Sequence, residues 1–156
     1  MKRLHVYKYQ GAGNDFVILD NRRGDVALTP RQINRICDRR FGVGADGLMT
    51  LCASDKADFE MHYYNADGPE GTMCGNGGRC IVAFADYLGI KPKDGKTYHF
   101  VAGDGPHTGE ILADNGEVKT VRIRMVDVSI FCPVLDGWFV DTGTRHFVKL
   151  DRKSVV

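Results

Sequence analysis

The feature that most restricts the fold of this chain is the segment at 77–88, GGRCIVAFADYL, which predicts a helix with apolar residues on nearly every side. Gly89 follows directly and supplies a stop signal. A helix without a polar face has to be surrounded by other parts of the protein. In a chain otherwise rich in strand-like stretches, we expect a curved sheet or barrel wrapped around it. A helix held between a sheet and a partner chain is the alternative.

Short apolar runs elsewhere predict strands rather than helices. They lie at 16–20, 48–52 and 59–64, and an Asn115-Gly116 pair predicts a hairpin turn before the alternating segment 118–125. The chain therefore indicates an α+β fold that is rich in strands.

A second helix is predicted after Thr29-Pro30, where Thr29 is an N-cap candidate and proline suits the first helical position. Ile33, Ile36 and Cys37 then recur at helical spacing, and Gly42 is the predicted end. We interpret this helix as scaffold.

Composition narrows the class of protein. With 156 residues, 43% hydrophobic and 26% charged, the chain is long enough for a packed domain. Its formal net charge of +1 gives no reason to expect nucleic acid or an anionic membrane as a partner. It has no apolar stretch of about eighteen residues and no signal-peptide pattern, so we expect a cytoplasmic protein.

The cysteines, at 37, 52, 74, 80 and 132, lack paired Cys-x-x-Cys spacing. We therefore expect neither a disulfide framework nor a metal site. Most of them are expected to be small buried apolar residues.

Cys74 differs, because it stands before Gly75, Asn76, Gly77 and Gly78 at the start of the apolar helix. A helix start presents unpaired N–H groups and a partial positive charge, which favour a thiolate and attract carboxylates. The glycines predict bare amides on which a carboxylate could bind beside the sulfur. A buried, inert cysteine is the alternative.

Two other motifs are weaker. The Cys74–Arg79 spacing is one residue shorter than that of a phosphatase loop, which leaves that function as a distant alternative. GVGADG at 42–47 fits a dinucleotide-binding pattern, but it follows a predicted helix and precedes a predicted strand, which is the reverse of the required order. We interpret it as a turn.

Four motifs together resemble the diaminopimelate epimerase family: KYQGAGNDFVILD, RRFGVGADGL, YYNADGPEGTMCGNGGRC and VAGDG, in this order. The resemblance implies a cofactor-independent isomerase without pyridoxal phosphate, which interconverts LL- and meso-diaminopimelate for lysine and cell-wall synthesis. It also implies two similar lobes with the active site between them. Each lobe is expected to be α+β, a mixed or antiparallel, barrel-like sheet wrapped around a central buried helix.

For individual residues, the resemblance implies that Cys74 is one of two catalytic bases. Gly75 and Asn76 would hold the substrate α-carboxylate, and Asn14 and Asn65 would bind its other polar groups. His146 would act near the catalytic pair.

The departures from the family pattern lie towards the end of the chain. The family's second catalytic cysteine, in an ACGTG-like motif, is absent, and Cys132 in FCPVL does not replace it. Thr144-Arg145 stands where the family has Asn-Pro. We expect a fragment with a first lobe at 1–127, the opening strands of a second lobe at 128–156, and little activity on its own.

Two other functions remain open. One is a different cofactor-free amino-acid racemase of the same superfamily, again with a small amino-acid substrate. The other is a non-catalytic half-domain that associates through its exposed face, for example as a homodimer.

Overall fold

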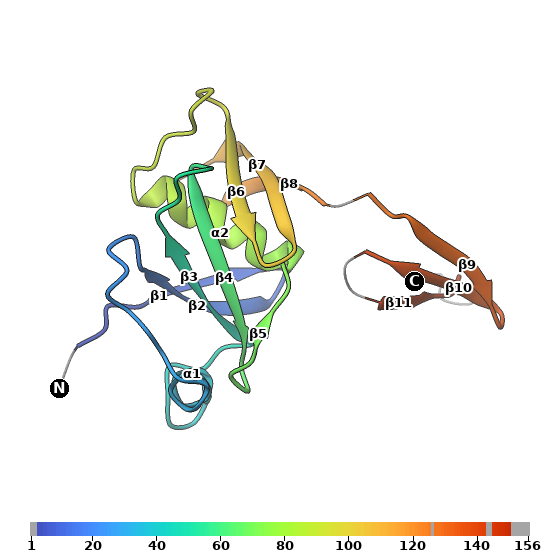
Figure 1. Ribbon diagram of the computed structural model, residues 1–156, viewed down its shortest axis with the longest axis horizontal. Coiled ribbons are helices and arrows are strands. Elements are labelled where there is room, and N and C mark those ends of the chain that lie inside the picture. The colour runs from blue at the N-terminus through green and yellow to red at the C-terminus, as the bar shows by residue number, and fades with distance from the viewer. Residues whose placement is uncertain (1–2, 126, 143–144, 151–156) are drawn as a thin grey trace. The chain divides into compact units, whose positions relative to one another are not determined.

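The computed structural model describes residues 3–125, 127–142 and 145–150. The chain divides into two compact units, Met1–Arg124 and Met125–Val156, which are described separately here (Figure 1). The sequence places the boundary nearby, after residue 127. Within the described ranges, no helix is long and apolar enough to cross a membrane.

An eight-stranded mixed sheet forms the frame of the first unit, in the order β1-β2-β3-β4-β6-β7-β8 with β5 beside β4. The strands are β1 (Tyr7–Gly11), β2 (Asn14–Asp20), β3 (Gly47–Cys52), β4 (Phe59–Asn65), β5 (Glu70–Gly71), β6 (Thr97–Ala102), β7 (Gly105–Asp114) and β8 (Lys119–Arg124). The β2–β3 and β4–β6 pairs are parallel, and the others are antiparallel. The predicted hairpin turn between β7 and β8 is confirmed, with Gly116 at φ 88°.

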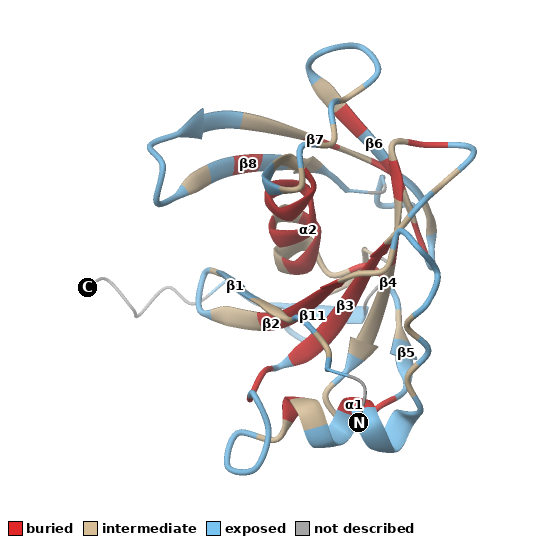
Figure 2. Ribbon diagram, turned by 90° about the vertical axis from the view of Figure 1, so that its left-hand side faces the viewer, coloured by how far each residue is buried: buried red, intermediate tan, exposed pale blue. Residues whose placement is uncertain are grey.

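The sheet curls around helix α2 (Gly75–Tyr87), whose ribbon is mostly red in the burial colouring of Figure 2. Its side chains pack with residues of the surrounding strands in one apolar cluster. Phe84 is fully buried, with its ring centroid 4.7 Å from that of Tyr7 and 5.7 Å from that of Tyr9. Gly89, at φ 76°, ends the helix. The prediction of an α+β fold with a surrounded helix is confirmed.

Helix α1 (Pro30–Cys37) covers the opposite face of the sheet. In β2, Phe16 and Ile18 pack into the α2 cluster, whereas Val17 and Leu19 pack with Ile33 of α1 in a second cluster. Alternate residues of a strand point to opposite faces, so two covered faces explain the unbroken apolar run of β2.

The predicted start of α1 is confirmed, because Thr29 and Gln32 form a capping box. The predicted end is wrong, since α1 stops at Cys37 and not at Gly42. Asp38 has extended backbone angles, φ −61° and ψ 122°, and its carboxylate accepts hydrogen bonds from the backbone N–H groups of Arg40 and Phe41, both at 2.7 Å. This turn replaces the last predicted helical residues.

The second unit contains a three-stranded antiparallel sheet in the order β11-β10-β9. Its strands are β9 (Ile130–Val134), β10 (Gly137–Asp141) and β11 (Arg145–Val148). The rings of Phe131 and Trp138 stack with centroids 4.4 Å apart.

Candidate active site

Cys74 is the N-cap residue of α2, with extended backbone angles φ −104° and ψ 127°. Its side chain makes no capping hydrogen bond to the helix backbone, and it is half-buried. The thiol therefore stands at the open start of the helix, where its chemistry is not used for capping.

The glycines after Cys74 differ in their hydrogen bonds, packing and exposure. The Gly78 N–H donates to the Cys74 carbonyl oxygen at 2.7 Å, so the expectation of a bare amide there is wrong. Gly77 is buried, and a Cβ at this position would lie 3.1 Å from the Met49 Sδ atom. Gly77 thus lets the helix start approach the sheet closely. Gly75 and Asn76 stay half-exposed, which leaves them as candidates for binding an anion.

Asn14 approaches the helix start from β2. The turn before it uses two left-handed residues, Ala12 at φ 55° and Gly13 at φ 83°, as tight hairpins require. The Asn14 Oδ1 atom lies 3.6 Å from the Cys74 sulfur and accepts a hydrogen bond from the Asn76 Nδ2 atom at 3.3 Å. Three of the residues singled out from the sequence are therefore in contact.

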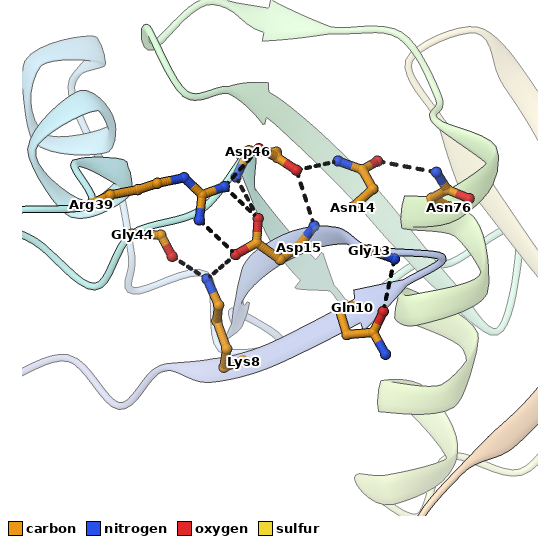
Figure 3. A network of polar contacts seen from close by, with 9 residues as sticks. All are labelled: Lys8, Gln10, Gly13, Asn14, Asp15, Arg39, Gly44, Asp46 and Asn76. Carbon is orange, nitrogen blue, oxygen red and sulfur yellow. Dashed lines mark hydrogen bonds and ion pairs between the residues drawn. The ribbon is translucent and has the colours of Figure 1, made fainter.

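A group of charged residues supports Asn14 from the other side (Figure 3). The Asn14 Nδ2 atom donates to Asp46 Oδ2 at 2.7 Å, and the Arg39 guanidinium bonds to the carboxylates of both Asp15 and Asp46. Lys8 Nζ lies 2.8 Å from Asp15 Oδ2.

These contacts keep both acidic groups ionised. The Arg39 guanidinium holds the pKa of Asp15 well below its usual range, and the hydrogen bond from Asn14 lowers the pKa of Asp46. Sequence reasoning missed Asp15, Arg39 and Asp46. The sequence did contain one signal, since Asp15 and Asp46 each stand directly before the apolar part of a strand. These two strands, β2 and β3, pair in parallel.

Asn65 ends β4, at the same end of the sheet as Asn14, because Gly47 of β3 pairs with both Phe16 and Asn65. Its backbone N–H donates to the Pro69 carbonyl oxygen at 2.9 Å. In the part of the chain that the structure describes, no hydrogen bond joins its side chain to Cys74, Asn14 or Asn76. Its role as a substrate contact stays a prediction.

His146 lies on β11 in the second unit, and its Nε2 atom is 3.1 Å from the Thr142 Oγ1 atom. Thr144 stands where the family has asparagine, and it lies outside the described residues. The predicted role of His146 stays a prediction.

Cys74 and the neighbouring Cys80 differ in how far they are buried. Cys80 is 3% exposed, and burial raises its pKa to about 12. Burial likewise raises the pKa of Tyr63. Tyr63 therefore stays a protonated phenol near the site at neutral pH.

Two hollows of the first unit lie away from Cys74. One, of about 530 Å³, is lined by residues such as His5 and Arg22, and the other, of about 270 Å³, by Cys52 and His62 among others. Neither is lined by Cys74, and the cluster around Cys74 is a candidate because of its chemistry. Among the described residues, no group of three His, Cys, Asp or Glu side chains could hold a metal ion.

A family model described as diaminopimelate epimerase matches residues 6–126. A protein named diaminopimelate epimerase from Chlorobaculum tepidum is 48% identical over 143 residues, which is 88% of this chain and 54% of the relative. Its namesake from Flavobacterium psychrophilum is 44% identical over 152 residues, 94% of this chain and 55% of the relative. The chain thus spans about half the length of these relatives.

Solved structures with the same fold are more distant in sequence. A Bacillus anthracis phenazine biosynthesis protein of the PhzF family superposes with a TM-score of 0.69 at 18% identity, over 94% of this chain and 55% of the other. A hydroxyproline epimerase from Agrobacterium vitis gives 0.58 at 12% identity, over 86% and 47%. The matched segment contains the whole Cys74 cluster and most of the first unit, and with relatives this similar the chain belongs to the diaminopimelate epimerase family.

Proposed function

We propose that this chain carries one half of the active site of a cofactor-independent epimerase that converts LL-diaminopimelate to meso-diaminopimelate. The contact of the Cys74 sulfur with Asn14, at the open start of α2, is the observation that carries the proposal. The names of the relatives support the substrate, a small amino acid of the lysine and cell-wall route. We expect such an enzyme in the cytoplasm.

Inversion at the α-carbon requires a proton to leave one face and another to arrive on the opposite face. In our proposal, the Cys74 thiolate takes the α-proton and becomes a thiol while a second acid donates a proton from the other side, and in the reverse direction Cys74 donates. The substrate's α-carboxylate gains negative charge as the C–H bond breaks. The half-exposed amides of Gly75 and Asn76 are suited to bind it.

The second acid–base group is expected in the half of the relatives that this chain does not match. One base alone exchanges the α-proton with solvent but does not invert the centre efficiently. His146 and Asn65 are proposed to help bind substrate or modulate the bases in the complete site.

The test uses the 156-residue chain and a chimera in which it replaces the matching part of the Chlorobaculum tepidum relative. We expect the chimera to epimerise LL-diaminopimelate and the chain alone to be nearly inactive. Cys74→Ala should abolish epimerisation by the chimera. Activity of the chimera that survives this substitution would reject the proposal.

A second candidate is a racemase for a different amino acid. The fold likeness to a hydroxyproline epimerase and the Thr144-Arg145 pair, which departs from the family pattern, favour it. The chimera's turnover of diaminopimelate should be compared with its turnover of proline, glutamate and histidine. Faster turnover of any of these three would favour the second candidate.

A third candidate is a non-catalytic half-domain that forms a homodimer. Exposed aromatic residues on the small sheet favour it, since Phe131 is 59% and Phe147 53% exposed. Light scattering on the chain tests this function, and a monomer at micromolar concentration would argue against it.

A further inference from the structure

The hydrogen bonds around Cys74 form a line of side-chain amides between two charged ends. At one end, the Asp46 carboxylate accepts from Asn14 Nδ2 at 2.7 Å. Asn14 Oδ1 then accepts from Asn76 Nδ2 at 3.3 Å. At the other end, the Arg79 guanidinium donates to Asn76 Oδ1. The Cys74 sulfur lies beside the middle of this line, 3.6 Å from Asn14 Oδ1.

The charged ends fix the orientation of the two side-chain amides between them, that is, which neighbour the oxygen and the NH₂ group of each amide face. An ionised carboxylate can only accept hydrogen bonds, and a guanidinium can only donate them. Asp46 therefore requires the NH₂ group of Asn14 to face it, and Arg79 requires the oxygen of Asn76. Both requirements turn the Asn14 oxygen towards Asn76 and Cys74. An amide without such neighbours could take either orientation.

Asp46 is itself held firmly in place. The backbone N–H of Asp15 donates to Asp46 Oδ2 at 3.2 Å, and the Arg39 guanidinium bonds to Asp46 Oδ1 at 2.7 Å. Figure 3 shows these contacts meeting at the Asp46 carboxylate. The Asp46 end of the line, one residue before β3, is thus held by two further hydrogen bonds, and it lies on the side of Asn14 away from the thiol.

We propose that Asp46 and Arg79 are positioning residues that orient the Asn14 amide so that its oxygen, and not its NH₂ group, faces the Cys74 sulfur. An oxygen at this place accepts a hydrogen bond from a thiol and repels a thiolate. It opposes the helix start, which favours the thiolate. In the direction of the proposed reaction in which Cys74 donates a proton, this orientation holds that proton on the sulfur before its transfer.

The inference rests on the proposed function only for the importance of Cys74. Orientation and thiol reactivity are both measured on the 156-residue chain without substrate. A chimera without epimerase activity would therefore refute the proposed function and leave the orientation of Asn14 to be judged separately.

The test is a double-substitution cycle with Asp46→Asn and Arg79→Met. The readout is the iodoacetamide alkylation rate of Cys74 at neutral pH, followed by peptide mass spectrometry, with the exposed Cys132 as reference in the same sample. Either remaining end still orients the line, so each single variant should change the rate only slightly. With both ends gone the amide can reverse and donate to the sulfur. The double variant should then exceed the product of the single effects by about fivefold.

This design separates orientation from simple charge effects. The double variant removes one negative and one positive charge, and independent electrostatic effects would multiply. A double-variant rate equal to that product would overturn the proposal. The matched control is Asp20→Asn with Arg22→Met, an ion pair at the far end of β2, which should leave the Cys74 rate unchanged.

A measurement on the unsubstituted chain covers the case in which a variant fails to fold. In the expected orientation, the Asn14 NH₂ protons lie near the Asp15 amide proton, since both donate to Asp46 Oδ2. Nuclear Overhauser effects between them are the expected result. Effects from the Asn14 NH₂ protons to the Cys74 β-protons instead would overturn the proposal.

Discussion

The two helices of the first unit differ in how the unpaired N–H groups of their first turn are treated. Helix α1 satisfies its first N–H groups internally through the Thr29–Gln32 capping box, and it lies on one face of the sheet. Helix α2 begins at Cys74 without a side-chain cap, and the sheet surrounds it. The stability of α2 comes from packing along its length, which leaves its first turn free for chemistry.

The largest expected effect tests whether α2 depends on enclosure. Phe84→Ala should lower the free energy of unfolding by about 3–5 kcal/mol, because it opens a cavity at the centre of the packed cluster. Urea unfolding followed by circular dichroism measures it. Phe41→Ala, the same change at a side chain 69% exposed beyond α1, should cost less than about 0.5 kcal/mol. Equal losses would contradict the contrast between the helices.

The next largest effect is expected from adding a side chain at a glycine near each helix, where the backbone lies close to neighbouring atoms. A Cβ at Gly42 would lie 2.2 Å from the Arg35 carbonyl oxygen and 2.5 Å from that of Ile36. Gly42→Ala should therefore cost about 1–3 kcal/mol in unfolding free energy. Gly77→Ala meets the sulfur of a flexible methionine side chain and should cost less. A larger loss at Gly77 would show that the start of α2 is the more rigid of the two.

A smaller effect compares the caps themselves. Thr29→Ala removes a working cap and should lower the unfolding free energy by about 1 kcal/mol. Cys74→Ser places a good capping side chain on a backbone already in the N-cap conformation, and it should raise the unfolding free energy by about 0.5–1 kcal/mol. Destabilisation by Cys74→Ser would mean that the thiol contributes to stability after all.

The smallest effect is that of acid on the charged group behind Asn14. The folded state lowers the pKa of Asp15 and Asp46. Their contribution is therefore fully present above the unfolded carboxyl pKa of about 3.9 and is lost as pH falls below it. Urea unfolding at a series of pH values should show a smaller acid loss for Asp15→Asn than for the unsubstituted chain. An identical pH dependence would contradict this contribution.

The sequence predicted those parts of the fold whose signals are local. The apolar run after Gly77 predicted a buried helix, and Thr29-Pro30 predicted the start of α1. It failed at the end of α1, because the Asp38 side chain bonds to nearby backbone N–H groups and competes with the helix. Helical spacing does not reveal that competition.

For the site, the sequence singled out Cys74, Asn14 and Asn76 but not the charged residues that orient them. Asp15 and Asp46 come together only because β2 and β3 pair in parallel with Phe16 beside Gly47. Two carboxylates side by side are unfavourable alone, and Arg39, from a third segment, makes the arrangement stable. No pattern within one segment encodes the register of a parallel pair.

The contact between Asn14 and Cys74 joins residues 60 positions apart, and this separation has a consequence for folding. Non-local contacts of this kind form late, after the loop between them has closed. At Gly11, a Cβ would lie in van der Waals contact with the Asn76 carbonyl oxygen, at 3.4 Å, so the β1–β2 hairpin has to dock against the helix before the sulfur meets its partner. A label that follows Cys74 during refolding would therefore time the closure of the sheet around the helix, and not the formation of the helix itself.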